Sequence, residues 1–189
     1  MGLSSHEPVL LSAESMAPGV DFNLLLRATA QLLPHLPDVR LVIFVQRDDP
    51  AYAPIKSAIA RHSIKDHVVI SFDTSREDWM AASDVGVVMS HADGHSPHVL
   101  ACMAAGLPVV AVNAGGNSEL IRHGESGYLV DFTDTDQLAM YITVLLLSPE
   151  LAERFGQAGR DRVARDHSYE RATRQRSDYF YALTHMAVS

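Results

Sequence analysis

Short apolar segments alternate with amphipathic segments along most of the chain, and this alternation limits the possible folds more than any other feature. The apolar segments have the length of strands, and they span residues 8–12, 40–45, 67–72, 84–89, 108–112 and 128–130. Helical spacing of apolar side chains marks residues 20–36, 51–64, 75–82, 97–105 and 117–122, and again the chain from 135 onward. Near-continuous apolar strands separated by helices are typical of parallel sheets that are covered on both faces. The sequence therefore predicts an α/β fold, a doubly wound, six-stranded, parallel Rossmann-like sheet with helices on both faces.

The length of the chain, 189 residues, favours one such domain. We expect that domain to span residues 7–183, with a flexible terminus at 1–6 and a frayed one at 184–189. The aromatic residues of the last helix, Tyr169, Tyr179, Phe180 and Tyr181, have two possible roles. They either pack on the chain's own sheet or form an apolar face that needs a partner.

The net charge of −8 argues against nucleic acid and anionic membranes as partners. An anionic small ligand remains possible, because backbone amides at one site can outweigh the net charge. We expect a cytoplasmic protein, because no apolar run approaches the ~18 residues of a membrane span and no leader pattern opens the sequence. The single cysteine, Cys102, excludes an internal disulfide and is expected in the core.

Two loops are expected at the carboxyl ends of strands, where such sheets bind ligands. In the first loop, residues 90–97, Ser96 is a good N-cap and Pro97 a good first helical residue, so the amides of residues 98–100 are expected to be available to an anion. In the second loop, residues 113–118, Gly115 and Gly116 permit positive φ, and Asn117 or Ser118 is expected to cap the next helix. On spacing alone, capped turns that bind nothing are the favoured interpretation of both loops.

The order of residues in DGHSPHVLACMAAGLPVVAVNAGGNSELIRHGESGYLV, residues 93–130, resembles the signature stretch of one enzyme family. This family is the retaining GT-B glycosyltransferases of family 4, also called group 1, and the resemblance is to their C-terminal domain. It continues more loosely from Glu7 to Leu183. It implies a single domain of the GT-B C-terminal type that binds a nucleotide sugar, a UDP- or GDP-sugar, and needs no metal or other cofactor.

The resemblance also assigns positions in the donor site. It places Asp93 against the donor sugar, with Gly94 and His95 beside it, and gives Ser96, His98 and Val99 to the loop that holds the diphosphate. Gly115, Gly116 and Glu119 match the second loop of the family pattern. No residue is assigned a catalytic role.

Several positions depart from the family pattern. The acidic residue that holds the ribose in the family is replaced here by Ala101, and a methyl group accepts no hydrogen bond. The Arg and Lys of the first loop correspond to Ala13 and Pro18, so both cations are missing. The same loop carries Glu14, which is expected to repel a phosphate.

Three hypotheses follow from these observations. The first is the donor half of a sugar transferase, not active alone, which needs an acceptor-binding domain, a partner chain or a second copy. The second is a degenerate, non-catalytic module for protein interaction or weak ligand sensing, and the third is an unrelated Rossmann domain that binds another phosphorylated ligand. A metal site at His91, His95 and His98 is a further alternative, although the loop and Pro97 interrupt the helical spacing of these residues.

Overall fold

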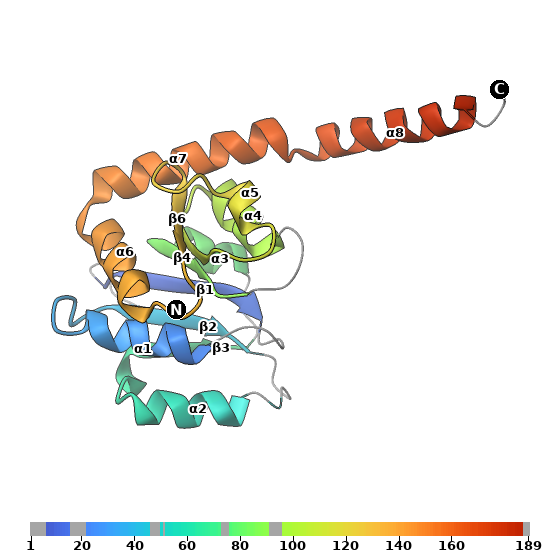
Figure 1. Cartoon of the computed structure of the whole chain (residues 1–189). Helices are drawn as coiled ribbons and strands as arrows, with labels where there is room; N and C mark the ends of the chain where they lie inside the picture. The colour runs from blue at the N-terminus through green and yellow to red at the C-terminus, as the bar shows by residue number, and fades with distance from the viewer. Residues whose placement is uncertain are drawn as a thin grey trace.

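The computed structural model describes residues 7–15, 22–45, 50, 52–72, 76–90 and 96–186, which form a six-stranded sheet between two layers of helices (Figure 1). The strands are β1 (Val9–Ser15), β2 (Arg40–Phe44), β3 (Val68–Ser71), β4 (Val85–Val88), β5 (Val109–Val112) and β6 (Gly127–Val130). Their order is β3-β2-β1-β4-β5-β6, and every pair is parallel. The predicted fold class is confirmed.

The helices lie where the amphipathic segments were predicted, and the helix at 97–105 has the predicted ends. They are α1 (Phe22–Leu32), α2 (Tyr52–Arg61), α3 (Arg76–Ala81), α4 (Pro97–Ala105), α5 (Asn117–Leu120), α6 (Thr135–Leu147), α7 (Pro149–Asp166) and α8 (Tyr169–Met186). A 3₁₀ turn at Lys65–His67 precedes β3. Among the described residues, no helix is both long enough and apolar enough to cross a membrane.

Alternate residues of the central strands enter two separate cores, one on each face of the sheet. Leu10 and Ile43 pack with apolar residues of α1, α2 and α6. Leu11 and Val42 pack with apolar residues of α3, α4 and α5. Because both faces are buried, the strands need apolar side chains at nearly every position, which is why they appear as continuous apolar runs in the sequence. Cys102 is fully buried in the second core, as predicted.

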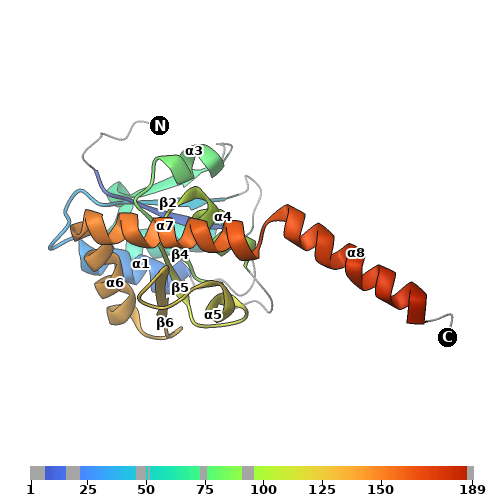
Figure 2. The same cartoon turned by 90° about the horizontal axis from the view of Figure 1, so that it is seen from above.

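The last two helices differ in how they contact the rest of the chain. Helix α7 lies across the domain and packs on α4, whereas α8 leads away from the sheet and its helices (Figures 1 and 2). Tyr179, Phe180 and Tyr181 on α8 are exposed, so they do not pack on their own sheet. The predicted limits of the domain, residues 7 and 183, stay predictions, and helix α8 continues to Met186.

Candidate functional site

The carboxyl ends of β1 and β4 lie side by side at the centre of the sheet. From β1 the chain proceeds through β2 to β3 on one side, and from β4 it proceeds through β5 to β6 on the other. The crossover connections therefore diverge at this pair of strands, which is the switch point where doubly wound sheets bind ligands. The ladder between the two strands ends at Ser12 and Val87.

Glu14 lies at this edge and points into the protein. The strand register shifts between Ser12 and Ser15, so β1 bulges here. The Met89 amide donates to Glu14 Oε2 at 2.5 Å and the Ser90 amide to Oε1 at 2.8 Å. The sequence placed Glu14 in the loop after the first strand, but β1 extends to Ser15 and the Glu14 side chain is only 1% exposed. The expected repulsion between Glu14 and a phosphate stays a prediction.

Burial changes the acidity of this carboxyl group. Removal from water raises the pKa of Glu14 from its ordinary value of 4.5 to about 7, although hydrogen bonds from Met89 and Ser90 act in the opposite direction. Glu14 therefore titrates near neutral pH at the edge of the sheet where a ligand is expected. Sequence reasoning noticed its charge but missed its burial, because the bulge depends on the pairing of β1 with β2.

Helix α4 begins as predicted, with Ser96 as N-cap and Pro97 as first residue. The availability of its amides was overestimated. The Val99 amide donates to Ser96 Oγ at 3.4 Å, and the Leu100 amide donates to the Ser96 carbonyl at 3.2 Å. The first of these contacts is longer than a usual hydrogen bond, so a stronger acceptor can replace it. His98 retains a first-turn amide that no other described group binds.

A groove of about 690 Å³ separates α3 from α4. The groove is lined by Arg76, Glu77, Met80, Ala81, Pro97, His98, Ala101 and Ala105. Ala101, which replaces the family's acidic residue, thus faces a space, and α3 contributes one charge of each sign to the opposite wall. Sequence reasoning did not find Arg76 or Glu77, because neither belongs to a recognisable motif.

His98 connects the first turn of α4 with this groove. Burial of the half-buried imidazole, and then the charge of Arg76, lowers the pKa of His98. The ring is therefore neutral at pH 7, where it exchanges hydrogen bonds without adding a charge. The Arg76 guanidinium lies over the Phe44 ring, with 5.3 Å between the guanidinium carbon and the ring centroid.

The second loop, between β5 and α5, differs from the prediction in the conformation of Gly116 and in the role of Asn117. Gly115 has the predicted positive φ of 54°, but Gly116 has a φ of −84° and is itself the N-cap of α5. Asn117 does not cap the helix, because its Nδ2 donates to the Val112 carbonyl at 3.0 Å. The buried Asn117 side chain thus fastens the loop to the end of β5.

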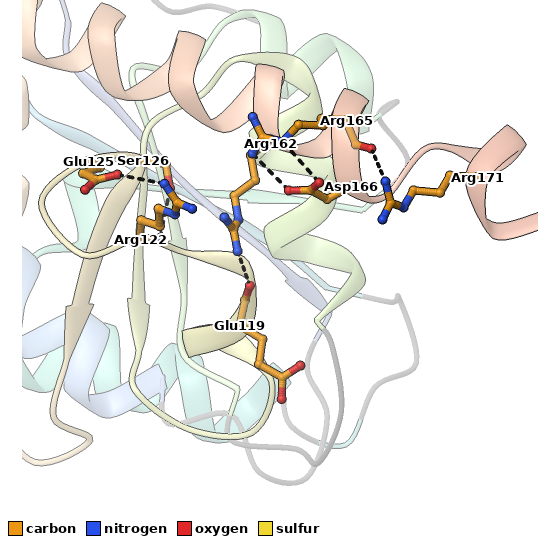
Figure 3. Close-up of polar contacts among 8 residues, drawn as sticks. All are labelled: Glu119, Arg122, Glu125, Ser126, Arg162, Arg165, Asp166 and Arg171. Atoms are coloured by element: carbon orange, nitrogen blue, oxygen red, sulfur yellow. Dashed lines mark hydrogen bonds and ion pairs between the residues drawn. The ribbon is translucent and has the colours of Figure 1, made fainter. Parts of the chain in front are cut away.

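Glu119 lies on α5, and its carbonyl and carboxylate point in different directions. Arg162 of α7 donates from Nη2 to the Glu119 carbonyl at 2.7 Å, whereas the Glu119 carboxylate points away from Arg162 (Figure 3). Beside this contact, Arg165 binds the Asp166 carboxylate at 3.0 Å, and Arg171 donates to the Arg165 carbonyl (Figure 3). The Arg162 side chain of α7 thus holds α5 through the backbone carbonyl of Glu119. The Glu119 carboxylate takes no part in this contact.

Three of the predicted donor-site residues, Asp93, Gly94 and His95, lie outside the described residues. The same is true of His91 and His95 in the alternative metal site. Within the described ranges, no group of three His, Cys, Asp or Glu residues could hold a metal ion. The structure brings Ser96, His98 and Val99 together at the start of α4, and it places Gly115, Gly116 and Glu119 in the next loop and helix along the chain.

Comparisons with known proteins agree with this architecture. The sequence model of the family described as "Glycosyl transferases group 1" matches residues 2–162. Among curated relatives, the chain is 25% identical over 181 residues to N-acetyl-alpha-D-glucosaminyl L-malate synthase of Bacillus anthracis. This match covers 95% of the chain and 47% of the relative, so the chain spans about half the length of that protein.

Solved structures show the same fold. Sucrose-phosphate synthase from Thermosynechococcus elongatus superposes with a TM-score of 0.88 at 26% identity, over 99% of this chain and 47% of the other. Anabaena HepE, solved in complex with UDP-glucose, superposes with a TM-score of 0.85 at 20% identity, over 94% of this chain and 49% of the other. The match of the family model over most of the chain, on a fold of this kind, leads to one conclusion: the chain belongs to the group 1 glycosyltransferases, as a domain of their C-terminal type.

Proposed function

We propose that this chain is the donor-binding half of a sugar transferase and that it binds a nucleotide sugar, a UDP- or GDP-sugar, at the carboxyl edge of the sheet. The observation that carries the proposal is the start of α4, where Ser96 caps the helix and the His98 amide stays available beside the groove. A helix start of this kind attracts phosphate through its amides and its dipole. HepE, a protein of the same fold, was solved with UDP-glucose, which supports this ligand class.

The proposal assigns the diphosphate to the first turn of α4 and the nucleoside to the groove between α3 and α4. In that arrangement the Val99 amide exchanges its 3.4 Å contact with Ser96 Oγ for a shorter one with a phosphate oxygen. As the family resemblance implies, Asp93 faces the donor sugar, and Glu119 belongs with Gly115 and Gly116 to the second loop of the site. Transfer itself needs an acceptor-binding domain or partner chain, because this chain spans only about half of its curated relatives.

The proposal can be tested by a substitution that adds a negative charge at the start of α4 and preserves the helix cap. Ser96→Asp keeps a side chain that caps well, so the domain should stay as stable as the wild type, whereas its carboxylate should repel a diphosphate. We expect UDP-glucose or GDP-mannose to bind at least about tenfold more weakly to this variant by calorimetry. Ser148→Asp is the matched control, because Ser148 is also an N-cap followed by proline, at the start of α7.

The results separate the hypotheses. Equal affinity of wild type and Ser96→Asp would show that the ligand does not bind at α4. No binding of either nucleotide sugar to the wild type would contradict the proposal and support the degenerate module. Equal binding of ADP and UDP would favour a less specific binder of phosphorylated ligands.

A further inference from the structure

At the carboxyl edge, a side chain takes over from the backbone in joining β1 to β4. The regular ladder between the two strands ends at the pair Ser12–Val87. Beyond this pair β1 bulges, and the two oxygens of Glu14 accept the amides of Met89 and Ser90. One carboxyl group therefore holds both Met89 and Ser90, which follow β4 in the chain.

This carboxyl group carries its charge in a dry environment. The Glu14 side chain is 1% exposed, and among the described residues only hydrogen bonds from Met89 and Ser90, not a cation, favour its ionised form. The charge of Glu14 acts on one titratable group of α4, the thiol of Cys102. Burial and then Glu14 raise the pKa of Cys102 to about 12, so the thiol stays neutral while Glu14 titrates. A buried negative charge of this kind interacts strongly with any second anion at the same edge.

We propose that Glu14 is a positioning residue with a titratable charge: it fixes the end of β4 through the Met89 and Ser90 amides, and it makes the binding of a diphosphate ligand depend on pH. The inference rests on the proposed function, because it needs the diphosphate to bind at the same edge of the sheet. Protonated Glu14 offers no charge to repel the ligand, whereas ionised Glu14 opposes binding. The affinity for a nucleotide sugar is therefore highest below neutral pH and falls as pH rises.

The first measurement is the affinity for UDP-glucose at about pH 6 and about pH 8, because its diphosphate does not itself titrate in this range. We expect wild-type affinity to fall by about fivefold between these two pH values, for a ligand-induced rise of one unit in the pKa of Glu14. Glu14→Gln has the same shape without the charge, so it should bind equally at both pH values and as tightly as the wild type at about pH 6. Calorimetry in buffers of different ionisation enthalpy should detect proton uptake by the wild type alone.

The matched control is Asp84→Asn. Asp84 Oδ2 accepts the Val9 amide at 2.7 Å, so this carboxylate joins the same two strands at the opposite edge. The control should keep the wild-type dependence of affinity on pH. A pH dependence that persists in Glu14→Gln, or wild-type affinity that is equal at the two pH values, would overturn the proposal.

A second measurement needs no ligand and separates this proposal from the proposed function. Hydrogen exchange of the Met89 and Ser90 amides, corrected for intrinsic rates, should slow in the wild type as pH rises and Glu14 ionises, because a carboxylate is the stronger acceptor. The protection of both amides in Glu14→Gln should not depend on pH. If UDP-glucose binds at no pH, the proposed function fails, and the exchange result alone decides whether Glu14 holds β4. Identical protection in the wild type and Glu14→Gln at both pH values would show that it does not.

Discussion

Gly156 of α7 lies directly against the carbonyl oxygen of Gly106, the residue at which α4 ends. A Cβ atom on Gly156 would come within 2.0 Å of that oxygen, a distance that the backbone of neither helix can accommodate without moving. Gly106 itself has a φ of 77°, and its amide bonds to carbonyls of α4. The absence of a side chain at Gly156 therefore sets how closely α7 packs on α4.

Gly156→Ala should therefore destabilise the domain. We expect a loss of about 2–4 kcal/mol in the free energy of unfolding, since the added methyl group meets backbone that is fixed by the end of α4. Urea denaturation would measure this loss. Gln157→Ala, one residue further on the exposed side of α7, should change stability by no more than about 0.5 kcal/mol. Equal effects of the two changes would contradict the close packing of α7 on α4.

The pH dependence of stability should report the burial of Glu14. The pKa of Glu14 is about 7 in the folded chain and 4.5 when solvated, so between these values the folded state binds more protons than the unfolded state. Stability contributed by this group therefore falls as pH rises from 4.5 to 7, by about 3 kcal/mol in total. Glu14→Gln should lack this decrease. Urea titrations at intervals across that range would test it, and parallel profiles for the two proteins would contradict it.

Ala101→Glu should strengthen nucleotide binding. Ala101 lines the groove between α3 and α4, and a carboxylate there can accept from the ribose hydroxyls as the family's acidic residue does. A charge-assisted hydrogen bond of this kind contributes ~1.5–3 kcal/mol, so we expect UDP to bind about tenfold more tightly or better by calorimetry. Ala105→Glu adds the same charge one turn later in the same groove. An equal effect at both positions would indicate a general charge effect instead of a ribose contact.

Arg76→Gln should raise the pKa of His98. Burial is the larger reason for the lowered pKa, and the charge of Arg76 is the smaller one. Removing the guanidinium should therefore move the pKa of His98 upward but leave it below its ordinary value. An NMR titration of the imidazole would show the shift, and Lys56→Gln on α2 serves as the control for a general change in charge. An unchanged titration of His98 would show that Arg76 does not act on the ring.

Local patterns were sufficient to predict much of this protein. The apolar runs gave the strands because both faces of the sheet are buried, and Ser96 followed by Pro97 marked the start of α4 because capping depends on neighbouring residues alone. The positive φ of Gly115 and the burial of Cys102 followed from residue type in the same way. Asn117 was misassigned, because its partner is the end of β5 and not the helix that it begins.

The environment of Glu14 could not be read from its neighbours. Its two amide partners, Met89 and Ser90, lie 75 and 76 residues further along the chain, and they reach it only because β4 pairs with β1 instead of β3. The groove at Ala101 likewise exists only where α3 and α4 pack side by side.

Periodicity, capping residues and the glycine pattern thus determined the succession of strands and helices along the chain, because these signals depend on contacts within a few residues. The same short patterns carried the family resemblance. Only the packing of distant segments decided that Glu14 is a dry, titratable acid and that Ala101 faces an open groove. The physical reason is that desolvation and charge coupling depend on what surrounds a group in three dimensions, and those surroundings come from parts of the chain far away in sequence.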